Sequence, residues 1–180
     1  MLKPLFSIVL SLFAFSWAFG QKVEIHASKD ADFSRYGSFY TMPGEIVLVM
    51  NKEVSREQLK ESVRKGLIGT LVDKGYRHTE DSASADLAIT FVAEIVERLE
   101  QQQLGPLGQT PASSGADLNR NDTWTQEIRS GSLAIEVVER STGKTLWRST
   151  TSINFRSFDL NQALQAAVAR GLRKFPRAKK

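Results

Sequence analysis

Residues 85–97 read ADLAITFVAEIVE. Side chains in this stretch alternate with a period of two, which predicts a long β-strand with two different faces. One face carries Leu87, Ile89, Phe91, Ala93 and Ile95, and the other carries Asp86, Ala88, Thr90, Val92, Glu94 and Val96. The first face is fully apolar, so we expect helices to cover it. The second face is only moderately apolar.

A second alternating stretch predicts an antiparallel neighbour for this strand. Residues 133–138 read LAIEVV, a Ser-Thr-Gly-Lys turn follows at 141–144, and the chain returns through residues 146–155. Two alternating runs joined by a short turn that contains glycine are typical of a β-hairpin. The return strand places Trp147 in phase with Ile153 and Phe155, so we expect Trp147 to be part of the core.

Two segments show the periodicity of amphipathic helices. Ser55 and Gln58 have the spacing of a capping box, and apolar side chains then recur at helical spacing until Gly75. A second helix is predicted from Asp159 until the chain reaches residues 175–176, Phe-Pro. Residues 66 and 69 of the first helix are glycines, each of which costs about 1 kcal/mol relative to Ala. We therefore expect a neighbouring element to approach the helix closely there.

These elements together predict one α+β domain over residues 21–180. We expect a four- or five-stranded, largely antiparallel sheet with the two amphipathic helices packed on one face. Phe33, Tyr36 and Phe39 recur at threes, which predicts an aromatic plug at one edge of the core. Residues 101–123 are rich in Gln, Gly, Pro and Ser and lack periodicity, which favours a disordered loop.

The first twenty residues have the pattern of an export signal peptide. Lys3 precedes an apolar stretch over residues 5–18, and residues 18–20 offer a small-x-small cleavage site before Gln21. The alternative is an uncleaved anchor, but the stretch is shorter than the roughly 20 apolar residues that a spanning helix needs. We expect a protein of the periplasm or the medium that has no membrane span after cleavage. Because residue 21 is Gln and not Cys, lipidation is not expected.

Charge is mixed along most of the chain, with 24 Lys and Arg and 20 Asp and Glu residues, for a formal net charge of +4. This pattern does not indicate a nucleic-acid partner. The exception is the C-terminal end, where no acidic residue follows Asp159. Two interpretations of that basic end remain open. It contacts an anionic polymer or lipid headgroups, or it is a helix C-terminus that suits the macrodipole and continues as a solvated tail.

The sequence contains no motif typical of an active site. It has no cysteine, and His26 and His78 are its only histidines, so we expect no metal site, no cofactor and no enzyme activity. The only carboxylate grouping that we consider for acid–base work consists of Glu94, Glu97 and Glu100 with Glu136 and Glu139. Strand pairing would bring Glu94 and Glu136 close and raise one pKa. The alternative is a solvent-facing row opposite basic partners such as Arg148.

Several short motifs occur in an order that resembles a known family. They are DADFSRYGSF at 30–39, DKGY at 73–76, ADL at 85–87, Gly131, TGK at 142–144 before LWR, and Phe-Pro at 175–176. From Lys22 to Pro176 the chain resembles the bacterial envelope family called domain of unknown function 4136. The resemblance implies an exported α+β domain, commonly lipid-anchored in the periplasm, with no assigned reaction. Gln21 departs from the lipidated Cys of the common pattern.

We therefore expect an exported, non-enzymatic binding or assembly module. Its moderately apolar sheet face would dock an envelope protein or another copy of the chain. The candidate binding residues are Thr90, Val92, Glu94, Trp124 and Glu136. Two alternatives are a small-ligand carrier with a cleft between sheet and helices, and a hydrolase that uses the paired glutamates.

Overall fold

The computed structural model describes residues 22–50, 54–103, 123–154 and 159–179, with the backbone only for 98–103, 123–129 and 154. The strands are β1 (Val23–Ala27), β2 (Ser38–Thr41), β3 (Glu45–Val49), β4 (Arg77–His78), β5 (Leu87–Gln103), β6 (Thr123–Glu139) and β7 (Thr145–Asn154). The helices are the 3-10 helix η2 (Phe33–Arg35), α2 (Arg56–Asp73) and α3 (Leu160–Gly171). The predicted export signal lies outside the described residues. The predicted loop covers residues 101–123. Its residues 101–103 belong to β5 and residue 123 belongs to β6, while residues 104–122 lie outside the described residues.

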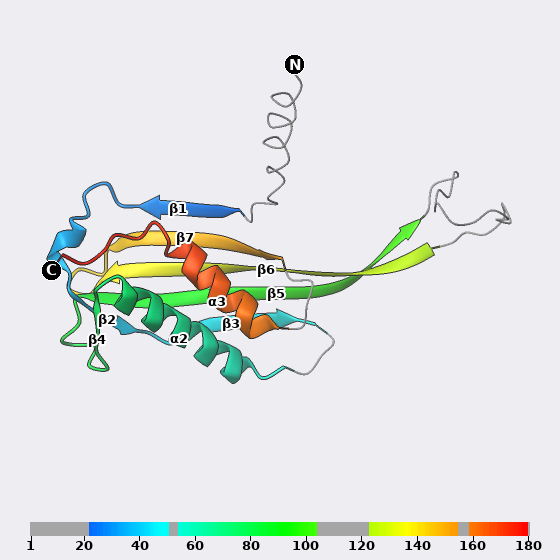
Figure 1. Ribbon diagram of the computed structural model, residues 1–180, viewed down its shortest axis with the longest axis horizontal. Helices are drawn as coiled ribbons and strands as arrows, with labels where there is room; N and C mark the ends of the chain where they lie inside the picture. The colour runs from blue at the N-terminus through cyan, green and yellow to red at the C-terminus, as the bar shows by residue number, and fades with distance from the viewer. Residues whose placement is uncertain (1–21, 51–53, 104–122, 155–158, 180) are drawn as a thin grey trace, which may run out of the picture.

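Within these residues seven strands form one mixed sheet (Figure 1). Its order is β1-β7-β6-β5-β2-β4, and β3 also pairs with β5. The pairs β1–β7, β6–β7 and β5–β6 are antiparallel, whereas β2–β4, β2–β5 and β3–β5 are parallel. The α+β class is confirmed. The predicted strand number and the largely antiparallel arrangement are wrong.

The error arises at one edge of β5, where two short strands share a single long partner. Strand β2 pairs with residues 87–89 and β3 pairs with residues 92–96. Pro43 and Gly44 separate the two short strands, and a Cβ at Gly44 would overlap the ring of Phe91. Neither short strand is long enough to display a clear period of two, so local patterning does not reveal their parallel pairing.

The carboxylate of Asp86, which directly precedes β5, forms hydrogen bonds to the start of β2. Asp86 accepts hydrogen bonds from the backbone N–H groups of Gly37 and Ser38, both at 2.9 Å, and from the Ser38 hydroxyl at 2.8 Å. Partial burial is the largest influence on the pKa of Asp86 and would raise it. The three hydrogen bonds outweigh burial and hold that pKa below its usual value. The carboxylate is therefore ionised at neutral pH and keeps this contact.

Both predicted helices are confirmed, together with both N-caps and the end of α2 before Gly75, whereas α3 ends at Gly171, earlier than the predicted end at Phe175 and Pro176. The Ser55 side chain accepts a hydrogen bond from the backbone N–H of Gln58, and the Asp159 side chain accepts one from Gln162. Each N-cap thereby satisfies a backbone donor that the first helical turn leaves unpaired. Gly75 has φ +93°, the left-handed conformation that commonly ends a helix.

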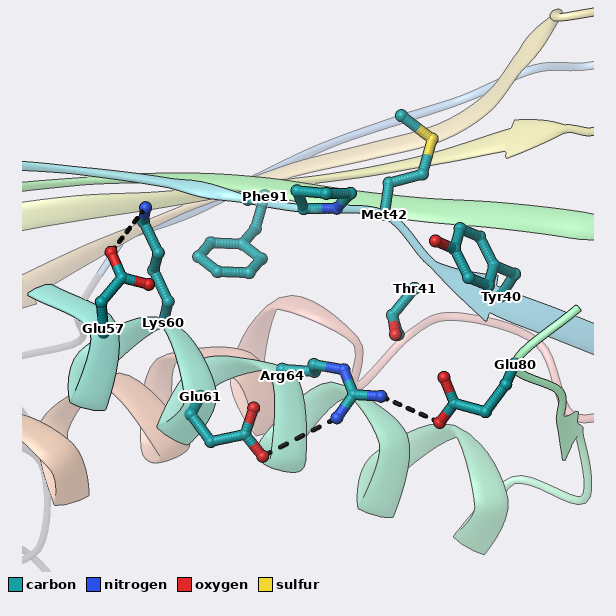
Figure 2. Close-up of a pocket in the computed structure, with 11 residues that line it drawn as sticks. Tyr40, Thr41, Met42, Glu57, Lys60, Glu61, Arg64, Glu80 and Phe91 are labelled. Atoms are coloured by element: carbon teal, nitrogen blue, oxygen red, sulfur yellow. Dashed lines mark hydrogen bonds and ion pairs between the residues drawn. The ribbon is translucent and has the colours of Figure 1, made fainter. Parts of the chain in front are cut away.

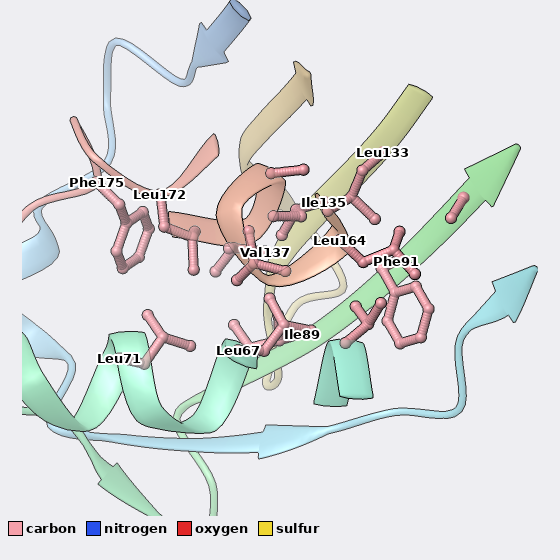
Figure 3. Close-up of a cluster of buried hydrophobic side chains, with 14 of the residues drawn as sticks. Leu67, Leu71, Ile89, Phe91, Leu133, Ile135, Val137, Leu164, Leu172 and Phe175 are labelled. Carbon is pink, nitrogen blue, oxygen red and sulfur yellow. The ribbon is translucent and has the colours of Figure 1, made fainter. Parts of the chain in front are cut away.

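The core lies between the two helices and one face of the sheet (Figure 3). Leu67 and Leu71 of α2 and Leu164 of α3 lie over side chains of β5 and β6, including Ile89 and Val137. The predicted apolar face of β5 is fully buried: Leu87, Ile89, Phe91, Ala93 and Ile95 are each at most 3% exposed. Burial of each large aliphatic side chain contributes about 1.5–3 kcal/mol.

The predicted aromatic contribution to the core is confirmed. Trp147 is buried, and so are Tyr36 and Phe39, while Phe33 packs partly buried against them. Phe175, which follows α3, joins this group: its ring centroid lies 5.2 Å from that of Phe33 and 5.5 Å from that of Trp147. The segment after α3 is thereby attached to the core. Phe155 lies outside the described residues.

The glycines of α2 behave differently from each other. A Cβ at Gly66 would lie 3.7 Å from the Val168 side chain of α3, so the expected close approach is confirmed there. Nothing lies within 4 Å of a Cβ at Gly69, so the expectation is wrong at that position. In β6, a Cβ at Gly131 would overlap the carbonyl oxygen of Glu94 in β5. Gly131 thus allows the close pairing of β5 with β6.

Gly131→Ala is expected to lower the free energy of unfolding by about 1–3 kcal/mol, because the added methyl group forces the paired backbones apart. Gly69→Ala, the control in open space, is expected to raise it by about 0.5–1 kcal/mol through helix propensity. Urea denaturation followed by circular dichroism measures both. Equal midpoints for Gly131→Ala and the unchanged protein would contradict this packing.

Candidate functional site

The face of the sheet opposite the helices is the candidate site. On β5 the buried residues Phe91 and Ala93 alternate with exposed residues Val92 and Glu94. The same alternation continues on β6. Residues 133, 135 and 137 are buried, whereas residues 132, 134, 136 and 138 are only half-buried. Within the described residues, therefore, no element covers this face.

An apolar patch lies at one side of this uncovered face. We define it by four side chains: Met42 and Val47 are each 41% exposed, Val92 is 48% exposed and Val49 is 52% exposed. Val47 pairs with Glu94, so its side chain lies on the same face of the sheet as that of Val92. Met42 directly follows β2 and stays attached to β5, because its backbone N–H donates to the carbonyl of Ile89. A contiguous exposed apolar surface is typical of an interaction site.

The apolar patch borders a free edge of the sheet. Among the described residues β3 pairs only with β5, so its outer edge carries unpaired backbone N–H and C=O groups. Residues 46–49 of this strand, Ile-Val-Leu-Val, include neither a charge nor a proline. Natural edge strands usually contain such residues because they prevent pairing with another chain. Glu45, the first residue of β3, is the one charge on this strand, so the edge along residues 46–49 lacks this protection.

The structure places most of the predicted binding residues on this face. Thr90, Val92 and Glu94 lie on β5 and Glu136 lies on β6, all directed away from the helices. Trp124 is in β6 opposite Gln102, and its side chain lies outside the described residues. The sequence analysis missed the contributions of β2 and β3, Met42, Val47 and Val49. The signal that could have found them is the apolar run over residues 46–50.

Glu94 and Glu136 are not brought together. Glu94 is opposite Ser132, and Glu136 is opposite Thr90, which separates the two glutamates by four positions along the strands. At about 3.3 Å per residue this offset is about 13 Å, too long for two carboxylates to share a proton. The structure therefore does not form the Glu94–Glu136 pair that the hydrolase alternative requires.

Glu136 instead forms the expected cross-strand pair. Its Oε1 accepts from the guanidinium of Arg148 at 2.9 Å and from the hydroxyl of Thr145 at 2.7 Å. The hydrogen bond from Thr145 is the largest influence and lowers the pKa of Glu136 below its usual value. Partial burial acts in the opposite direction, and Arg148 lowers the pKa further. The charge of Glu136 is therefore compensated within the sheet.

A pocket of about 360 Å³ lies on the other side of the sheet edge, between α2 and the β2–β3 connection (Figure 2). Its lining residues are Tyr40, Thr41, Met42, Pro43, Gly44, Glu57, Lys60, Glu61, Arg64, Glu80 and Phe91. Lys60 is paired with Glu57 at 3.2 Å, and Arg64 is paired with Glu61 at 3.7 Å and with Glu80 at 3.0 Å. The pocket combines an apolar wall at Phe91 with cations that already have partners.

The part of the chain that the structure describes contains neither a metal-binding cluster nor a membrane-spanning helix. No three His, Cys, Asp or Glu side chains there gather closely enough to hold a metal ion. His78 Nδ1 lies 3.8 Å from Glu80, while His26 is on β1 opposite Arg148. Among the described helices, none has both the length and the apolar character that crossing a membrane requires.

Comparison with known proteins identifies the fold. The family described as "Domain of unknown function (DUF4136)" matches residues 23–177, close to the range of the resemblance seen in the sequence. A DUF4136 family protein from Bacteroides thetaiotaomicron is 18% identical, with coverage of 85% of this chain and 94% of that chain and a TM-score of 0.52. The PelC dodecamer from Paraburkholderia phytofirmans is 14% identical, with coverage of 89% and 100% and a TM-score of 0.52. None of the curated proteins matches this chain.

Glu136→Gln is expected to lower the free energy of unfolding by about 1 kcal/mol at pH 7, because it removes a carboxylate that accepts two hydrogen bonds. The pKa of Glu136 is lowered by folding, so its contribution is complete above the unfolded pKa of about 4.3 and is lost as the pH falls through the folded pKa. The difference between variant and unchanged protein should therefore disappear at low pH. Denaturation at a series of pH values measures it.

The matched control is Glu94→Gln on the same face. Glu94 has no hydrogen-bond or ion-pair partner within the described residues, so we expect a change within about 0.5 kcal/mol. An equal loss in both variants at pH 7, or a loss in Glu136→Gln that persists in acid, would contradict the role given to the Arg148 and Thr145 contacts.

Proposed function

This chain belongs to the DUF4136 family, and on that premise we propose that it is an exported, non-enzymatic binding module that assembles with other copies of itself. The observation that carries the proposal is the apolar patch beside the free edge of β3, where residues 46–49 carry no charge. Burial of exposed apolar surface is the main favourable contribution to association between proteins. The patch and the free edge lie together, so one partner can cover both.

Self-association is supported by the composition of the uncovered face. The cores of protein interfaces are depleted of charged residues, and here the charge of Glu136 is compensated by Arg148. Glu45 and Glu94 are exposed beside the patch, so in this arrangement they belong to the polar rim of the interface. PelC, which has a similar fold, is a dodecamer. For this chain we propose a second copy as the occupant of the patch. An unrelated envelope protein is the alternative partner.

Export and lack of catalysis complete the proposal. The pattern of residues 1–20 supports export to the periplasm or the medium, with cleavage before Gln21 and without a lipid anchor. The separation of Glu94 from Glu136 removes the one carboxylate pair that acid–base catalysis would use. A binding role therefore agrees better with the described side chains than a hydrolytic role does.

Val92→Glu is expected to weaken self-association about tenfold or more, because the interface would have to bury a further carboxylate directly opposite Glu45 and beside Glu94. Val92 is 48% exposed in the single chain, so the effect on folding should stay near 0.5 kcal/mol. Size-exclusion chromatography with light scattering over a range of protein concentrations measures the oligomeric state.

Val72→Glu is the matched control, because Val72 is also 48% exposed but lies on α2, away from the patch. We expect this variant to assemble as the unchanged protein does. The proposal fails if the unchanged protein is a monomer at every concentration, or if the two variants weaken association equally.

One observation favours a second candidate, the small-ligand carrier. The pocket beside α2 has about 360 Å³, within the roughly 300–1,000 Å³ range of small-molecule sites, and lies between helix and sheet edge as a carrier cleft would. Native mass spectrometry of protein recovered after export would reveal a bound molecule as additional mass that disappears on denaturation. A mass equal to that of the polypeptide alone would remove this candidate.

A further inference from the structure

The C-terminal end concentrates the positive charge of the whole molecule. Six of the 24 basic residues follow Asp159, where there is no acidic residue, so the preceding chain has 18 basic against 20 acidic residues and a net charge of −2. The sequence left two interpretations open, a contact surface for an anionic partner or a solvated tail. The structure distinguishes between them.

The segment after α3 is held against the body of the protein. The Phe175 side chain is 2% exposed and packs 5.6 Å from the ring of Tyr76. The ammonium group of Lys74 donates to the carbonyl oxygens of Arg173 and Phe175 at 3.2 and 2.7 Å, and the N–H of Ala178 donates to the Lys74 carbonyl at 3.0 Å. The solvated-tail interpretation is therefore wrong for this segment.

Three cations on this anchored segment have no anionic partner. Arg173, Lys174 and Arg177 are exposed, and none of them forms an ion pair with any residue that the structure describes. Burial lowers the pKa of Lys74, and the charge of nearby Arg177 lowers it further. The fold thus brings like charges together, and Asp32, which interacts electrostatically with Lys179 of the same segment, forms no ion pair with any of the three. This arrangement favours an external anion at this end.

The position of the segment indicates the shape of that anion. In Figure 1 the C-terminus lies at one end of the long axis of the molecule, beside η2 and away from the centre of the sheet. None of the pockets described for the protein is lined by Arg173, Lys174 or Arg177. A small anion or a linear polymer is usually held in a pocket or groove, whereas a membrane surface requires neither.

We propose that Arg173, Lys174 and Arg177 dock the exported protein on the phosphate groups of an anionic phospholipid bilayer. Guanidinium groups match phosphate oxygens in bidentate geometry, and two of the three cations are arginines. Because the rest of the chain has a net negative charge, the same field orients the molecule with this end toward the lipid. This surface is separate from the apolar patch, and the proposal does not depend on self-association.

The test measures binding of the protein, recovered after export, to vesicles of 30% phosphatidylglycerol in phosphatidylcholine and to vesicles of phosphatidylcholine alone, by flotation at low salt. We expect binding to the anionic vesicles only, with a decrease as salt is added. The triple variant R173Q/K174Q/R177Q should bind about a hundredfold more weakly, from the contribution of each cation near an anionic surface. Arg177→Gln alone should lose about fivefold.

The matched control K22Q/R56Q/K65Q removes the same charge from exposed positions just before β1 and on α2. It should keep most of the vesicle binding, and thermal denaturation shows whether each variant is folded. If the triple variant does not fold, the single variant Arg177→Gln decides.

Four results would overturn the proposal. The first is the absence of binding to the anionic vesicles at low salt. The second is an equal loss of binding in the control and in the variants of the C-terminal segment. The third is stronger binding to a soluble anionic polysaccharide than to vesicles, which would identify a polymer as the partner. Displacement from the vesicles by millimolar inorganic phosphate would likewise contradict a requirement for a lipid surface.

Discussion

The two faces of β5 are the constraint on which the rest of the structure depends. Its odd-numbered side chains form the floor of the core under α2 and α3, so the strand cannot shift its register by one residue without exposure of that entire set. On one side β5 pairs with β6 over its whole length, and on the other it pairs with β2 and β3 in succession. The position of every other strand follows from this one.

The same constraint produces the candidate site. Because β5 fixes which side chains face the helices, it also fixes which side chains remain uncovered. Val92 lies on this uncovered side, and β3 adds Val47 and Val49 beside it. The edge of β3 has no further strand among the described residues. An unpaired edge and an apolar surface thus occur together because one short strand ends the sheet there.

Local signals allowed about half of the fold to be predicted. The period of two in β5, β6 and β7 and the caps at Ser55 and Asp159 depend only on neighbouring residues, so the sequence displays them directly. The parallel pairing of β2 and β3 depends on contacts between distant residues, which no local period reports. The offset of Glu94 from Glu136 has the same cause, since the register of a pair is set by the core and not by either strand alone.

The C-terminal segment illustrates a third limit. Its charges are plain in the sequence, but its attachment depends on Phe175 and Lys74, which are 101 residues apart. Only the folded structure shows that the segment with Arg173, Lys174 and Arg177 is held against the core. The molecule therefore has two different surfaces, the sheet face with the apolar patch and the basic end, and nothing requires them to serve one partner.

The central claim is that the uncovered sheet face is an interface between copies of this chain. The most direct measurement is the rate of peroxide oxidation of Met42, which lies in the apolar patch, with Met50, which packs partly buried against the core, as internal reference. We expect Met42 to oxidise more slowly as protein concentration rises, while the rate for Met50 stays constant. A rate for Met42 that is the same at all concentrations would contradict the account.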